Sequence, residues 1–274
     1  MKIGWRCDVG TVRKLNEDSV ACVRLDAHFQ KGDESAGLFV VADGMGGHNA
    51  GEIASENGIK TFVTEYFSNM FKIDKTADKP DETIKPRRLD QALADAIIKA
   101  NEVIFKMSES GQGMQGMGTT MTAALISGED LYVSHVGDSR CYVIHEREAI
   151  QITKDHSFVQ ELVDAGKITA DEARVHPQKN VITRVVGYDK VVKVEAYHRK
   201  LFQGDNILLC SDGLWGVVPD SKITQLVLFA ETPQQACDAL IKEANKMGGP
   251  DNISVIIVQP ERLAFLSGSH VKNP

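Results

Sequence analysis

Short apolar runs rich in β-branched residues recur along the chain, and each is bounded by turn-forming residues. Such runs are typical of β-strands, because branched side chains fit a pleated surface while Gly, Asn and Asp favour turns. Two of the gaps between runs, 128–129 and 146–148, are too short for a parallel crossover and predict antiparallel hairpins. The runs cover residues 19–25, 37–43, 120–127, 130–137, 140–146, 149–153, 191–198, 206–212 and 252–259.

Apolar residues at helical spacing predict three long helices, over residues 50–70, 88–107 and 233–247. Only the polar segment 72–86, which we expect to be an exposed loop, separates the first two. An alternating parallel β/α architecture would place a strand there. The pattern therefore predicts an α+β fold, a four-layer α-β-β-α sandwich in which two antiparallel sheets are flanked by helix pairs.

Composition narrows the functional class. With 274 residues, 42% hydrophobic and 25% charged, the chain is ordinary for a globular protein and not for a disordered one. A net charge of -7 without a basic stripe argues against nucleic-acid binding, and no apolar run approaches the ~18 residues of a membrane span. Five scattered cysteines favour reduced thiols. We expect a soluble, cytoplasmic protein with one domain over residues 1–260 and a tail, 261–274, of no assigned role.

Acidic residues adjoin the predicted strands repeatedly. Each of four aspartates has a glycine next to it or close by: Asp43, Asp138, Asp212 and Asp251. The end of one strand and the start of its antiparallel partner lie at the same edge of a sheet, so these carboxylates can converge there with the pair Glu17 and Asp18. For any one of them, Asp-Gly is also ordinary turn chemistry. Four together favour a shared site.

Converging carboxylates repel one another, so a cation must lie among them. Oxygen ligands without His or Cys favour Mg²⁺ or Mn²⁺ over zinc or copper. Four acids exceed what one Mg²⁺ takes, because that ion keeps several waters, and two ions bridged by a carboxylate fit better. The neighbouring glycines would let a backbone carbonyl approach an ion.

An ordered set of motifs carries a resemblance that spans about residues 3 to 259. The set resembles the type-2C metal-dependent protein phosphatase family in its bacterial single-domain form, for which the sandwich and the metal centre are expected. The motifs are 13-RKLNED-18, 43-DGMGGHNAGE-52, 118-GTTMTAAL-125, 135-HVGDSR-140, 155-DHS-157, 180-NVITRVVG-187, 211-SDGLW-215 and 250-PDNISV-255.

The resemblance assigns roles to the aspartates. It implies that Asp43 bridges two Mn²⁺ or Mg²⁺ ions and that the Gly44 carbonyl binds one of them. Asp212 and Asp251 would complete the coordination of the first ion. Asp138 matches the ligand of a third, weaker site that also uses the Asp212 position.

Other residues are expected to act around the ions. Glu17 and Asp18, with Asn252 beside them, match positions that orient metal-bound water. Arg13 matches the arginine that binds the substrate phosphate, for which a guanidinium offers a two-pronged contact. The implied reaction is hydrolysis of phosphoserine and phosphothreonine in proteins by activated water, without a phosphoenzyme. Catalysis would depend on Arg13, Asp43 and Asp212.

The general acid stays open. Eukaryotic members of the family have a histidine two positions after the aspartate of the DG motif, where this chain has Met45. Either a metal-bound water protonates the leaving group, or His48 or His156 does. Each histidine also has a structural interpretation, in the turn for His48 and in a local hydrogen bond for His156.

The segment 157–180, called the flap below, resembles the mobile element beside the cleft in bacterial members. We expect it to move and to help select the phosphoprotein, because so polar a segment contributes little core. The resemblance further implies a monomer that opposes a bacterial serine/threonine kinase, whose identity the sequence does not give.

Three rival interpretations compete with the phosphatase assignment. The stretch 111-GQGMQG-116 matches G-x-G-x-x-G, but a helix precedes it and a strand follows, which is the reverse of a dinucleotide-binding turn. A catalytically inactive binding domain would usually have lost its metal acids, and all are present here. A phosphatase of small metabolites stays open, although the flap favours protein substrates.

Overall fold

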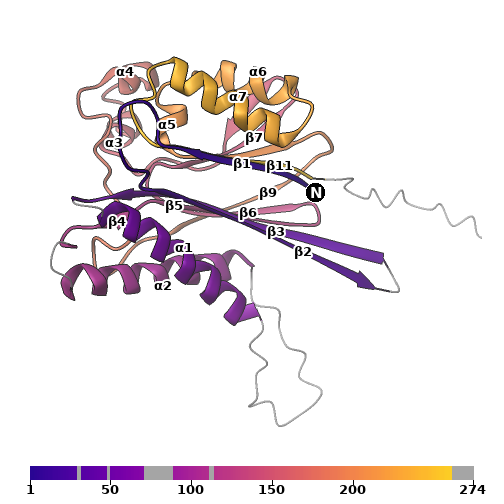
Figure 1. Cartoon of the computed structure of the whole chain (residues 1–274), viewed down its shortest axis with the longest axis horizontal. Coiled ribbons are helices and arrows are strands. Elements are labelled where there is room, and N and C mark those ends of the chain that lie inside the picture. Colours follow the sequence, from indigo (N-terminus) through magenta and orange to yellow (C-terminus); the bar gives the residue numbers. More distant parts are fainter. Residues whose placement is uncertain (30–31, 48–49, 71–88, 111–113, 261–274) are drawn as a thin grey trace, which may run out of the picture.

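The chain folds into four layers, a helix pair, two stacked sheets and a second helix pair (Figure 1). The computed structural model describes residues 1–29, 32–47, 50–70, 89–110 and 114–260. Among these residues all strand pairs are antiparallel, which confirms the predicted α+β sandwich. The predicted loop 72–86 and the tail 261–274 lie outside the described residues.

Each sheet mixes strands from distant parts of the sequence. In spatial order the first sheet contains β1 (Lys2–Asp8), β11 (Ile253–Gln259), β10 (Asn206–Cys210), β7 (Arg140–His145) and β8 (Glu148–Gln151). The second contains β2 (Asp18–Phe29), β3 (Gly32–Met45), β5 (Met121–Ser127), β6 (Asp130–Val136) and β9 (Glu195–Lys200), with β4 (Gly118–Thr119) beside β3. The two predicted hairpins are present as β5–β6 and β7–β8.

The helices cover the outer faces of the sheets. The second sheet packs against α1 (Ala50–Met70) and α2 (Leu89–Ser110), and the first sheet packs against α6 (Asp220–Phe229) and α7 (Pro233–Lys246). Three short helices lie together at one end of the sandwich, at the left of Figure 1: α3 (Phe158–Asp164), α4 (Ala170–Val175) and α5 (Asp212–Trp215). This end carries the site described below.

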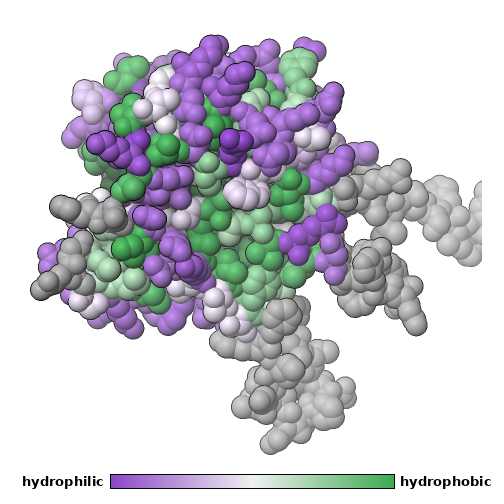
Figure 2. Space-filling model, in the orientation of Figure 1, coloured by the Kyte–Doolittle hydropathy of each residue, from purple (hydrophilic) through white to green (hydrophobic). Residues whose placement is uncertain are grey.

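Alternation along the strands divides the core into layers. On β3, Leu38, Val40 and Ala42 pack toward α1 and α2. The intervening Phe39 and Val41 pack toward the other sheet. Both faces of the strand are therefore buried, which explains its nearly continuous apolar run. On the face shown in Figure 2, hydrophilic residues cover most of the helical layers and hydrophobic residues show between them.

Several elements were not predicted from the sequence, among them β1 and α6. Strand β1 mixes charged and apolar residues because it is an edge strand, and its Gly4 lies under α7, where a Cβ would come 2.3 Å from the Pro233 carbonyl carbon. Helix α6 is short and buries only one stripe, which includes Ile223 and Val227. The prediction of a strand over 191–194 was wrong, since β9 begins at Glu195.

Candidate metal centre

Asp43 and Asp18 lie opposite each other where β3 ends and β2 begins. The backbone at Asp43 is fixed by Thr120, whose hydroxyl accepts from the Asp43 N–H at 2.9 Å and whose N–H donates to the Asp43 carbonyl at 2.8 Å. The predicted convergence of acids at one sheet edge is therefore present for this pair.

Ser211 links the first sheet to Asp18 in the second sheet. It follows β10, and its Oγ donates to Asp18 Oδ2 at 2.7 Å while accepting from the N–H of Ser254 in β11 at 2.9 Å. The next residue, Asp212, opens α5, and its carboxyl lies close enough to that of Asp43 to hydrogen-bond with it. One serine thus joins three strands around two of the predicted acids.

Glycine lets the backbones meet around Asp43 and Asp212. A Cβ on Gly44 would lie 2.1 Å from the Gly51 carbonyl oxygen, and one on Gly213 would lie 2.0 Å from that of Asn252. No other residue fits either position without moving the backbone. The Asp-Gly pairs therefore serve the close approach of separate segments and not only a turn.

Asn252 fixes the loop that carries Arg13, the predicted phosphate-binding residue. Its Nδ2 donates to the carbonyls of Val9 and Leu15 at 3.0 and 2.8 Å, and its Oδ1 accepts from the Glu17 N–H at 2.7 Å. The Glu17 carboxyl packs against Gly51 at the start of α1. Asn252 therefore holds Glu17 beside the cluster through the backbone.

Arg13 and Asp251 form an ion pair at the mouth of the cluster. Arg13 Nη2 lies 2.7 Å from Asp251 Oδ2, and the two side chains are 50% and 34% exposed. The structure thus joins the predicted phosphate ligand directly to a predicted metal ligand.

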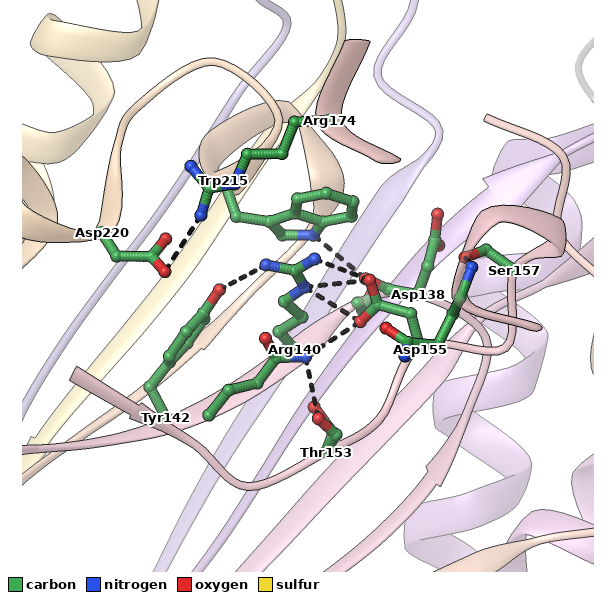
Figure 3. Close-up of polar contacts among 12 residues, drawn as sticks. Asp138, Arg140, Tyr142, Thr153, Asp155, Ser157, Arg174, Trp215 and Asp220 are labelled. Carbon is green, nitrogen blue, oxygen red and sulfur yellow. Dashed lines mark hydrogen bonds and ion pairs between the residues drawn. The ribbon is translucent and has the colours of Figure 1, made fainter. Parts of the chain in front are cut away.

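Asp138 follows β6, after Gly137 with φ +113°. The Trp215 Nε1–H, from the end of α5, donates to the Asp138 carbonyl at 3.0 Å (Figure 3). Beneath the indole ring lies Arg140, whose guanidinium carbon is 3.5 Å from the ring centroid and whose charge is paired with Asp155. Asp138 and Asp212 are thereby fixed relative to each other through Trp215.

Burial dominates the electrostatics of the cluster. It raises the pKa of Asp18 to about 7 and that of Asp212 to about 6, and neighbouring carboxylates add to both shifts. The pKa values of Asp43 and Asp138 are raised well above their ordinary range for the same two reasons. Without a positive partner, these groups can be charged together only at a large cost.

The donor set fits a hard divalent cation. One buried carboxylate oxygen of Asp18, of Asp138 and of Asp212 has no hydrogen-bond partner. Buried orphan oxygens of this kind are what Mg²⁺ or Mn²⁺ would bind. In the described part of the chain no three acidic, His or Cys side chains are posed as a finished ligand set, and Asp251 faces Arg13 instead.

The sequence profile of the family described as protein phosphatase 2C matches residues 6–253. The chain belongs to the protein phosphatase 2C family. It is 34% identical over 259 residues to the serine/threonine phosphatase stp of Listeria monocytogenes, covering 94% of this chain and 96% of that one.

Solved structures of phosphatases support the same family assignment. The crystal structure of Stp1 from Staphylococcus aureus is 34% identical, with a TM-score of 0.79 and 96% of each chain covered. The catalytic domain of the phosphatase PstP in complex with two manganese ions is 36% identical, with a TM-score of 0.72 and 93% and 96% of the two chains covered. The present chain is therefore a protein-serine/threonine phosphatase of the 2C family.

Neither histidine proposed as the general acid can be assigned that role. His48 lies outside the described residues. His156 is 5% exposed, its Nδ1 accepts from the Gly137 N–H at 3.1 Å, and its Nε2 lies 3.4 Å from Glu195 Oε1. Both ring nitrogens thus have partners other than the aspartates, and the general acid stays unassigned.

Sequence reasoning missed the polar groups that organise the phosphatase centre. Ser211 and Thr120 lie within recognised motifs, yet their hydrogen bonds to Asp18 and Asp43 cross between strands far apart in sequence. The stack of Arg140 on Trp215 is likewise long-range. All five cysteines are free in the structure, and burial raises the pKa of Cys210.

Proposed function

We propose that this phosphatase hydrolyses phosphoserine and phosphothreonine in proteins at a centre of two Mn²⁺ or Mg²⁺ ions, with Asp138 contributing to a third, weaker site. Asp43, Asp212, Asp251 and the Gly44 carbonyl would hold the two ions. The cluster of buried, mutually repelling carboxylates with orphan oxygens carries the proposal. The two manganese ions in the PstP catalytic domain support the number of ions.

Bound divalent ions supply activation of water and neutralisation of phosphate charge. The chain's own residues position the reactants. Glu17, held through its backbone by Asn252, and Asp18, opposite Asp43, would accept protons from water at the cluster. Arg13 would exchange its contact with Asp251 for two oxygens of the substrate phosphate, which frees Asp251 for an ion.

The proposal extends to biology and architecture. Residues 1–260 would form one catalytic domain, with the flap at about 157–180 on the substrate side. The phosphatase would act as a cytoplasmic monomer on phosphoproteins made by a serine/threonine kinase. Within the described residues no helix combines the length and apolarity needed to cross a bilayer.

Hydrolysis of p-nitrophenyl phosphate and of a phosphothreonine peptide with added Mn²⁺, and again after chelation, tests the central claim. We expect activity that requires the ion, is restored by adding it back and is lost in Asp43→Ala and Asp212→Ala. Isothermal titration with Mn²⁺ supplies a second readout, and the same variants should bind fewer ions. Full activity after exhaustive chelation would refute the proposal.

A further inference from the structure

A groove of about 330 Å³ lies beside the metal centre, between the flap and the segment that joins α5 to α6. Asp212 lines one end of it, so the groove is continuous with the cluster where the substrate phosphate would be bound. Figure 3 looks into this region, with Trp215 and Arg140 in the middle and the Arg174–Asp220 pair beside them. Its volume is near the lower end of ligand pockets, about 300–1,000 Å³, which suits a side chain and not a folded module.

Both walls of the groove contribute apolar side chains, which lie among the uncharged polar residues Gln151, Ser157, Gln160 and Asn180. On the flap, Val159 and Val163 are one turn apart on α3, and Ala170 and Ala173 are one turn apart on α4, so each pair shares a helix face. These helices bury almost nothing in the core, since Val159 is the one buried residue of α3 and α4 has none. The opposite wall is made of Trp215, Val217, Val218 and Pro219.

The charges that line the groove are largely paired with one another. Arg140 and Asp155 are only 13% and 5% exposed and lie 2.7 Å apart, so the buried end presents no uncompensated charge to an apolar occupant. At the rim, Arg174 lies 3.1 Å from Asp220 and joins the flap to α6. Such an exposed pair contributes little to stability, so it does little to hold the flap against α6.

Lys179 is the remaining cation of the lining, and it makes no ion pair within the described residues. Its charge acts on Asp212, whose pKa it lowers against the dominant effect of burial. The positive end of the groove thus lies toward the metal centre, where the dianionic phosphate of a substrate would arrive. The rest of the groove combines the two ion pairs with apolar and uncharged polar side chains.

We propose that the groove binds an apolar side chain of the substrate, from a residue near the phosphoserine or phosphothreonine. The inference rests on the proposed function. A peptide anchored by its phosphate at the cluster must continue over the adjoining surface, and this hollow begins at Asp212. Burying one large apolar side chain there would favour binding enough to select among phosphorylation sites.

Phosphothreonine peptides test the proposal. In a serine-rich host peptide, one leucine is moved through each position that flanks the phosphothreonine, and kcat/KM is measured with Mn²⁺ for every peptide. At one position we expect kcat/KM to exceed that of the leucine-free peptide by about tenfold or more. A ratio near one at every position would overturn the proposal.

Two matched flap variants locate the effect. Ala173→Leu fills the groove, so the leucine preference should fall toward one. Ala165→Leu makes the same change at the exposed end of α3, outside the lining, and should keep the wild-type ratio. A preference that survives in Ala173→Leu, or is lost equally in both, contradicts the groove. If Ala173→Leu fails to fold in a thermal scan, Val163→Ser replaces it with the same expectation.

Hydrolysis of p-nitrophenyl phosphate by the wild type separates this inference from the proposed function. If Mn²⁺-dependent hydrolysis of that small ester is present but no leucine preference is found, only the groove proposal fails. If the ester is not hydrolysed, both proposals fail. A groove covered by a second copy of the chain would give a dimer in light scattering and no peptide preference, which also overturns the inference.

Discussion

Arg13 has two possible negative partners, the Asp251 carboxylate that it contacts and the substrate phosphate that it is proposed to bind. Arg13→Ala should raise KM for a phosphopeptide by about tenfold, equivalent to about 1.4 kcal/mol, and lower kcat less. Arg13→Lys should restore only part of the loss, because an ammonium lacks the planar fork. Steady-state kinetics with saturating Mn²⁺ measures KM and kcat for both variants. An unchanged KM with a large fall in kcat would assign Arg13 to the chemical step instead.

His135 shows how one buried residue affects acid stability. It is completely buried, its Nδ1 hydrogen-bonds with the Thr122 hydroxyl, and burial lowers its pKa from 6.5 to about 3, with a smaller contribution from His156. Between these values the unfolded chain takes up a proton that the folded protein refuses. The contribution is therefore lost as pH falls from about 6.5 toward about 3, by at most about 1.4 kcal/mol per pH unit.

The variant His135→Gln keeps a group able to hydrogen-bond to Thr122 but cannot titrate. Denaturant unfolding of the Mn²⁺-saturated protein at pH 7, 6 and 5 should show the wild type losing stability faster than this variant. Parallel curves for the two proteins would mean that His135 is not the group responsible.

At the scale of elements, α5 places Asp212 at its first residue and Trp215 at its last. The Trp215 Nε1–H satisfies the Asp138 carbonyl, and an unsatisfied buried acceptor costs about 1–3 kcal/mol. Trp215→Phe keeps an aromatic ring for Arg140 but removes this donor. We expect lower stability by about that amount and a fall in kcat greater than any change in KM, because Asp138 is less well fixed.

The second tryptophan provides the control. Trp5 in β1 is 53% exposed and far from α5 in the sequence, and Trp5→Phe should alter neither stability nor turnover appreciably. Thermal unfolding and phosphopeptide kinetics on both variants make the comparison. Equal effects of the two substitutions would show that the Trp215 contact with Asp138 has no special role.

The helices and strands also show which features of the fold could be predicted from the sequence and which could not. The continuous apolar run within residues 37–43 predicted a buried strand, and the acid at its end predicted one component of the site, because both signals are local. Strand β1 was not predicted, because only its pairing with β11 shows that it is an edge strand. The bond from Ser211 to Asp18 joins residues 193 positions apart, and only the folded sheets determine such contacts.

At the scale of the whole molecule, two stacked sheets deliver carboxylates from separate strands to one edge of a chain whose net charge is -7. Sheet packing and side-chain burial stabilise the fold while they force these groups together. The cluster is therefore a cost to folding that a bound cation can offset. Metal binding and pH should consequently act on stability through the same groups.

The direction of that coupling follows from the raised pKa values. Asp18 and Asp212 have folded-state pKa values of about 7 and about 6, against an ordinary 3.8. Groups with raised pKa values favour the folded state fully below the ordinary value, and this contribution is lost as pH rises through about 6 to 7. Without divalent ions the repulsion is thus worst at neutral and higher pH, where ions also meet least competition from protons.

Mn²⁺ should therefore raise the unfolding temperature more at pH 8 than at pH 5. Taking the difference between Mn²⁺-loaded and chelated protein at each pH removes the effect of His135, which acts equally on both forms. In Asp212→Asn the difference should be smaller at pH 8 and should vary less with pH, because one repelling charge is gone. Differential scanning fluorimetry at both pH values measures the increase in unfolding temperature caused by Mn²⁺. If that increase does not depend on pH, the cluster is not where the ion binds.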